Sequence, residues 1–237
     1  YVMYHASVTD LIIKWILEHR AENPGIEPGD MFICNDPWVG AVHQNDAVVI
    51  APIFHEDELF GWVSSTLHQV DVGGNEIGSF SIEDDDAFAE AEPVPPMKIV
   101  EDGELRADVE DLMLRKSRAA PLLGMDLRAQ IAANNVAIDR ARELVDDYGA
   151  NTVKAVMNET MEYAEESLRA RLRELPDGVW RHVAYQDVAN ADDRSVYRTR
   201  LELRKEGDGL SFRVSGDEAA GVINTTYAGM RGALTRS

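Results

Sequence analysis

The stretch DAVVIAPIFHEDELFGWVSSTL, residues 46–67, contains two runs of strand-forming residues on either side of a charged turn. DAVVIAPIF and LFGWVSSTL are rich in β-branched and aromatic side chains, and the segment HEDE between them is typical of a turn. Antiparallel pairing about a turn centred near Asp57 would place Asp46 opposite Leu67. The sequence therefore predicts a β-hairpin in this stretch.

A His-x-x-Asp pattern occurs twice at the open end of this hairpin, as His43-Gln-Asn-Asp46 and His68-Gln-Val-Asp71. Folding the hairpin would bring the two patterns together, and Asp36 just upstream offers one more oxygen. Imidazole and carboxylate together suit Mn²⁺, Fe²⁺ or Zn²⁺, whereas an all-oxygen shell would favour Mg²⁺ or Ca²⁺. The competing interpretation is a surface hairpin whose acids only cap turns.

Gly73 and Gly74 follow the second pattern and are candidate substrate-binding residues, because a glycine backbone can take positive φ and approach a ligand closely. Glycines after a strand more often form a simple turn, and no Walker-type Gly-Lys-Ser/Thr follows them. His5 lies far from these motifs in sequence, and it either approaches the site or only packs. The basic residues 115–118 are interpreted as paired surface charges rather than as a phosphate site.

The charge of the chain restricts its partners. Forty-three acidic residues against 23 basic ones give 237 residues a net charge of −20, which argues against binding to nucleic acid or to an anionic membrane surface. There is no run of about 18 apolar residues that could cross a membrane. The single cysteine, Cys34, cannot form an internal disulfide and is expected to be buried, so we expect a cytoplasmic protein.

Hydrophobic periodicity predicts the other elements. Helical spacing is found in Val8–Ala21, and a short strand is expected at Met31–Cys34. Two long helices, Asp126–Tyr148 and Thr152–Leu175, are expected to form an antiparallel helical hairpin. Short β-patterned segments then follow, at Val179–Tyr185, Val196–Leu203, Leu210–Val214 and Gly221–Asn224.

This order predicts an α+β fold, with antiparallel β-hairpins and sheet plus the helical hairpin. We divide residues 1–237 into a metal-site β region (1–100), a helical region (107–175) and a second β region (178–237). The first residue is not Met and no closing element is evident at the end, so we expect a fragment of a larger chain, truncated at its C-terminus.

Several motifs together resemble the hydantoinase B/oxoprolinase family. They are Pro28–Pro37, Gly40–Asp46, His68–Gly74, Arg115–Arg118, Asp126–Gln130, Tyr148-Gly149, Pro176–Gly178 and Gly221–Asn224. Their order spans nearly the whole chain. Members include N-methylhydantoinase B, the C-terminal module of 5-oxoprolinase and the acetone carboxylase large subunit, and residues 42–46, 62–68 and 125–129 look most similar to the last of these.

The resemblance implies a metal-dependent catalytic module of an ATP-dependent complex, a cyclic-amide hydrolase or a ketone carboxylase. A hydantoinase A-type partner would bind ATP and phosphorylate a small-molecule substrate, with a small third subunit as a further candidate partner. The implied metal ligands are His43, Asp46 and His68, with Asp36 and Asp71 as additional candidates, and manganese is favoured over zinc or iron. Two alternatives are a non-catalytic assembly subunit with a structural metal and a stand-alone metallohydrolase.

Overall fold

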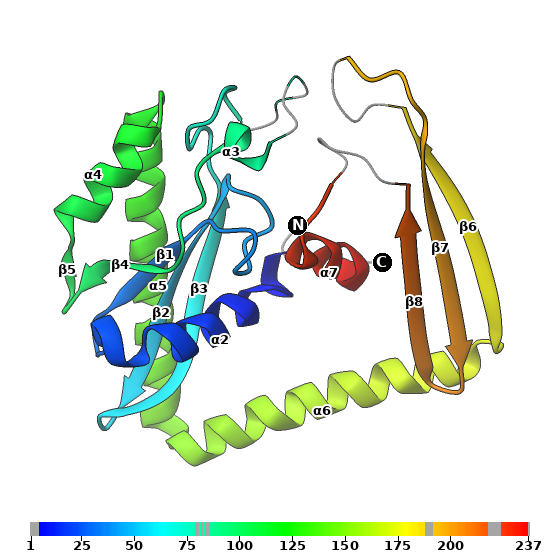
Figure 1. Cartoon of the computed structure of the whole chain (residues 1–237). Coiled ribbons are helices and arrows are strands. Elements are labelled where there is room, and N and C mark those ends of the chain that lie inside the picture. The colour runs from blue at the N-terminus through cyan, green and yellow to red at the C-terminus, as the bar shows by residue number, and fades with distance from the viewer. Residues whose placement is uncertain are drawn as a thin grey trace. The chain divides into compact units, whose positions relative to one another are not determined.

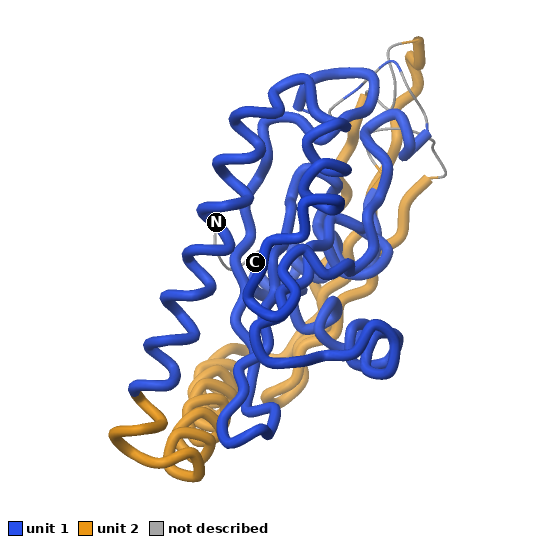
Figure 2. The backbone as a smooth tube through the Cα atoms, turned by 90° about the vertical axis from the view of Figure 1, so that its left-hand side faces the viewer, with its two compact units in different colours: residues 1–143, 225–237 blue, residues 144–224 orange. Residues whose placement is uncertain are grey.

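The computed structural model describes residues 5–78, 81, 83, 86–187, 192–217 and 224–236. The chain forms two compact units, one of residues 1–143 and 225–237 and one of residues 144–224 (Figure 2). The first unit contains α2 (Thr9–His19), the short π-helical turn η1 (Ala21–Gly25), β1 (Met31–Cys34), β2 (Asp46–His55), β3 (Glu58–His68), α3 (Ala87–Glu90), β4 (Met97–Glu101), β5 (Glu104–Leu105), α4 (Ala107–Lys116), most of α5 (Ala120–Tyr148) and α7 (Tyr227–Arg236). The predicted α+β class with antiparallel sheets is confirmed.

The sheet of the first unit has the order β3-β2-β1-β4-β5, and all its neighbouring strands are antiparallel. Helix α2 covers one face and α5 the other (Figure 1). Alternate residues of β1 and β2 therefore face different helices: Phe32 and Ile50 pack with Ile12 of α2, whereas Ile33 and Val49 belong to the core beneath α5. Because both faces are buried, these strands are apolar throughout rather than alternating.

The predicted hairpin is confirmed, but the predicted register is wrong by one residue. Both turn residues, Glu56 and Asp57, have positive φ (50° and 64°), as a two-residue hairpin turn requires. A β-bulge between Ile53 and Phe54 then takes up one extra residue of β3, so Asp46 pairs with His68 rather than with Leu67.

Helix α5 begins six residues earlier than the predicted Asp126. Pro121 lies in its first turn, where the missing N–H has no partner to lose, and Leu123 is fully buried in the core. Gly149, with φ of +81°, separates α5 from α6 (Ala150–Glu174). The two helices belong largely to different units, so their antiparallel packing stays a prediction.

The second unit combines α6 with an antiparallel sheet of β6 (Gly178–Gln186), β7 (Tyr197–Glu206) and β8 (Gly209–Gly216). Buried Lys205 binds the Asp177 carboxylate at 2.7 Å and also the carbonyl of Leu175, which ties the end of α6 to the sheet. Most of the predicted segment Gly221–Asn224 lies outside the described residues. Helix α7 follows it and was not predicted. Among the described helices, none combines the length and the apolar character needed to span a bilayer.

Candidate metal centre

Three of the predicted ligands meet at the open end of the β2–β3 hairpin. Asp46 Oδ1 lies 3.2 Å from His68 Nδ1, and Asp46 Oδ2 lies 3.2 Å from His43 Nε2. One ligand atom of each residue lies within 4.8 Å of those of the other two. Asp46 and His68 come from paired strands, whereas His43 reaches the carboxylate from the preceding loop, three residues upstream in the chain. A single ion could therefore contact all three side chains.

The environment favours the protonation states that bind metal. Burial raises the pKa of the Asp46 carboxyl, but the surrounding imidazoles of His5, His43 and His68 outweigh this effect and leave that pKa below its usual value. Burial lowers the pKa of His43; Asp46 opposes this effect, and the neighbouring His68 and His5 add to it. An ionised carboxylate beside a neutral imidazole is a typical donor pair for a divalent cation.

One atom of this cluster lacks a well-formed hydrogen bond. Asp46 Oδ2 is buried, and no described group donates to it with acceptable geometry, although two imidazole nitrogens lie nearby. A buried carboxylate oxygen without a donor is costly in a folded protein. A cation in contact with this oxygen would offset that cost. The side chains of His43 and His68 are 37% and 56% exposed, so one side of the cluster stays open to solvent or substrate.

Buried amides hold the loops that carry these ligands. Asn45 Nδ2 donates to the carbonyl of Gln69 at 3.0 Å, and Gln69 N–H donates to the Asn45 carbonyl at 2.7 Å. From α5, Gln130 Nε2 donates to the carbonyl of Ala47 at 2.9 Å, and its Oε1 accepts from Gln69 Nε2 at 3.1 Å. The amide residues inside the two His-x-x-Asp motifs therefore join the His43 loop to the end of β3. Sequence reasoning did not assign them this role.

The other two predicted ligands make different contacts. Asp36 Oδ1 accepts the N–H of Trp38 at 2.9 Å and so caps a turn. Asp71 is fully buried and bound through both carboxylate oxygens by Arg118, with Ser117 Oγ also 3.4 Å away. Neither residue belongs to the compact cluster of three, and their role as ligands stays a prediction. Arg118 was expected to pair on the surface, but its partner Asp71 is buried.

The glycine loop has a structural requirement of its own. Gly73 and Gly74 have φ of +109° and +78°, as the sequence suggested. A Cβ on Gly74 would lie 2.0 Å from the carbonyl oxygen of Glu90, so the loop passes directly against α3. Arg118 also donates to the carbonyls of Gly73, Asn75 and Glu76, which fixes the loop from the other side. Binding of substrate by Gly73 and Gly74 stays a prediction.

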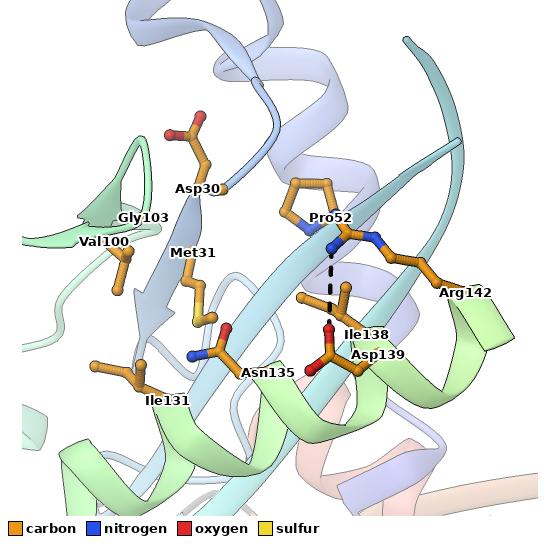
Figure 3. A pocket seen from close by; sticks show the side chains of 11 residues that line it. Asp30, Met31, Pro52, Val100, Gly103, Ile131, Asn135, Ile138, Asp139 and Arg142 are labelled. Atoms are coloured by element: carbon orange, nitrogen blue, oxygen red, sulfur yellow. Dashed lines mark ion pairs between the residues drawn. The ribbon is translucent and has the colours of Figure 1, made fainter. Parts of the chain in front are cut away.

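A small pocket of about 120 Å³ lies on the α5 side of the first unit (Figure 3). Pro52 and Met31 line it, and Asp139 and Arg142 form an ion pair at 4.0 Å beside it. Pro52 is six residues beyond Asp46 on β2, which corresponds to roughly 20 Å along a strand. The pocket is therefore not part of the metal centre.

Comparison with known proteins identifies the group to which this chain is related. The family model described as hydantoinase B/oxoprolinase matches residues 1–236. The chain belongs to this family. As a family member it is 33% identical, over 85% of its length, to a putative D-/L-hydantoinase of Pseudomonas sp. (strain NS671), to the B-type component of that enzyme, of which it covers 34%. It is 31% identical, over 89% of its length, to the acetophenone carboxylase delta subunit of Aromatoleum aromaticum, of which it covers 31%.

Among solved structures, this hydantoinase B/oxoprolinase chain is similar to the ATP-dependent caprolactamase of Pseudomonas jessenii. The TM-score is 0.86 at 27% identity, over 98% of this chain and 39% of the other. Acetone carboxylase gives a TM-score of 0.81 at 26% identity, over 90% and 30% of the two chains. The chain thus spans about a third of the length of the curated relatives that it matches.

Proposed function

We propose that this chain carries the metal centre of a catalytic subunit or module in an ATP-dependent enzyme, with His43, Asp46 and His68 as ligands. The observation that carries the proposal is the convergence of these side chains around a buried carboxylate oxygen without a hydrogen-bond donor. Membership in a family whose named relatives include hydantoinase and carboxylase subunits supports it. Manganese is the favoured ion, with zinc or iron as alternatives that the same donor set accepts.

The proposed chemistry assigns separate tasks to the chain and to its partner. A hydantoinase A-type partner would phosphorylate a cyclic amide or a ketone at the expense of ATP, and the product would enter the open side of the centre. A bound divalent ion would supply Lewis acidity there, by polarising an oxygen or activating water. Neutral His43 and His68 would supply nitrogen lone pairs, and ionised Asp46 would supply negative charge and orientation.

The reaction class is either cyclic-amide hydrolysis or ketone carboxylation. Residues 42–46, 62–68 and 125–129 favour a ketone carboxylase, whereas relatives of both classes match the chain. Incubation of the reconstituted complex with ATP, labelled bicarbonate and a ketone, beside a parallel reaction with a lactam, separates them. Fixed label indicates carboxylation, and ring-opened amino acid indicates hydrolysis.

Elemental analysis of the purified protein tests the metal directly. We expect about one equivalent of Mn, Zn or Fe, lost in both His43→Ala and His68→Ala and retained in the control His55→Ala at the other end of the hairpin. Asp36→Asn and Asp71→Asn extend the test to the two further predicted ligands. Absence of metal from the wild type, or metal that neither histidine variant removes, would defeat the proposal.

The second candidate is a non-catalytic assembly subunit with a structural metal. The large proportion of exposed acidic side chains favours a role in binding a partner. Size-exclusion chromatography of the His43→Ala complex distinguishes the two functions: a catalytic centre loses turnover while the complex still forms, whereas a structural centre loses assembly first.

A further inference from the structure

A third histidine reaches the cluster from the N-terminal segment. His5 Nε2 lies 3.1 Å from Asp46 Oδ2, and His43 Nε2 lies 3.2 Å from the same oxygen. Two donor atoms that bind one ion at about 2.1 Å each, at tetrahedral or octahedral angles, lie roughly 3.0–3.4 Å apart. The observed separations therefore match those expected of ligand atoms that share a cation.

The fold explains why His5 lies there. Side chains alternate along β2, so Asp46 points to the same face of the sheet as Val48 and Ile50, and α2 covers this face. His68 shares this face because it is paired directly with Asp46. His5 immediately precedes α2, and the helix therefore delivers it to the face on which the ligands gather.

Several contacts fix the start of α2 against the site. The His5 carbonyl accepts hydrogen bonds from Val8 N–H at 3.1 Å and from Thr9 Oγ1 at 3.2 Å. Asp10 forms an ion pair with Arg231 of α7 at 3.1 Å. A Cβ on Gly40, in the loop before His43, would lie 2.7 Å from a side-chain carbon of Ile12 in α2. The position of His5 is therefore supported by packing on two sides.

We propose that His5 is a further ligand of this metal centre and supplies a third imidazole. The inference rests on the proposed metal function and adds a donor that the two His-x-x-Asp motifs do not contain. His43, Asp46 and His68 form the compact part of the set, and His5 joins it at Asp46 Oδ2. With one carboxylate and three neutral imidazoles, a divalent ion keeps a net positive charge, which favours an anionic group such as a phosphorylated substrate in its open positions.

Metal affinity and ligand counting test the inference without using activity. The wild-type protein, His5→Gln and the matched control His55→Gln are stripped with chelator, checked for equal thermal unfolding, and titrated with Mn²⁺ and Cu²⁺. We expect His5→Gln to weaken binding by at least about 10-fold and His55→Gln to bind as the wild type does. Pulsed electron paramagnetic resonance of the Cu²⁺ forms should detect one coupled imidazole fewer in His5→Gln than in the wild type.

Each other outcome has a separate meaning. Unchanged affinity and an unchanged number of coupled imidazoles in His5→Gln, together with loss of metal in His43→Ala, would overturn the assignment of His5 and leave the proposed function intact. Weaker binding with an unchanged number of coupled imidazoles would also overturn it, because His5 would then only orient Asp46. Failure of the wild type to bind any ion would defeat the proposed function itself.

Discussion

Asp46 and His68 face each other directly across the β2–β3 ladder, with His68 Nδ1 3.2 Å from Asp46 Oδ1. The turn at Glu56 and Asp57 alone would have placed Leu67 opposite Asp46. The bulge between Ile53 and Phe54 shifts the pairing by one residue and so brings His68 to the face of the sheet that Asp46 occupies. A geometric irregularity far from the cluster therefore decides its composition.

Cross-strand disulfides test this register. In a Cys34→Ala background, Ala47→Cys with Leu67→Cys should oxidise readily, because directly opposite residues have the Cα separation that a disulfide accepts. Ala47→Cys with Thr66→Cys, the pair expected without the bulge, should stay reduced, since adjacent strand positions point to opposite faces. Non-reducing electrophoresis after mild oxidation measures both, and preferential cross-linking of the second pair would disprove the bulged register.

The buried Asp71–Arg118 pair predicts a pH-dependent contribution to stability. Burial raises the pKa of Asp71, but hydrogen bonds and charge from Arg118 outweigh it and hold that pKa below its usual value. A carboxyl with a lowered folded pKa stabilises the fold above the unfolded pKa of about 3.9, and this stability is lost as the pH falls through the folded value. Asp71→Asn should therefore unfold more easily than wild type at pH 7, and the difference should shrink below about pH 4.

Urea unfolding at several pH values measures this difference. Asp57→Asn, which removes the same charge from an exposed turn, serves as the control and should show little pH-dependent change. A gap between wild type and Asp71→Asn that stays constant from pH 7 to pH 3 would contradict the role given to the ion pair.

Two glycines of one loop form a matched pair for substitution. Gly74→Ala should destabilise the protein by more than about 2 kcal/mol, because its backbone has φ of +78° and the new Cβ would lie 2.0 Å from the Glu90 carbonyl oxygen. Gly78→Ala meets no atom within 4 Å at φ of +89° and should cost only about 1–2 kcal/mol of backbone strain. Equal unfolding free energies of the two variants would show that contact with α3 does not restrict the loop.

Cys34 should be unreactive in the native protein. It is completely buried on β1, and burial raises the pKa of its thiol to about 12. At pH 8 only about one thiol in ten thousand would be ionised, and the thiolate is the reactive form. Labelling with iodoacetamide should be undetectable in the folded protein and rapid in denaturant. Rapid labelling of the native state would refute the buried assignment.

The sequence by itself determined the local elements and the chemistry of the candidate site. Strand β1, the β2–β3 hairpin and α2 follow from apolar and β-branched periodicity, which acts over a few residues and needs no distant partner. The residue types of His43, Asp46 and His68 likewise indicated a divalent metal before their positions were known.

The tertiary structure decided what depends on distant partners. Arg118 pairs with Asp71 from 47 residues away, and His5 reaches Asp46 from 41 positions upstream through the packing of α2. Helix α5 starts early because Leu123 is buried in the core, which local spacing does not reveal. The bulge that selects His68 over Leu67 is likewise a property of the paired strands. Local periodicity fixes which residues form an element, whereas only packing fixes which residues from different elements meet.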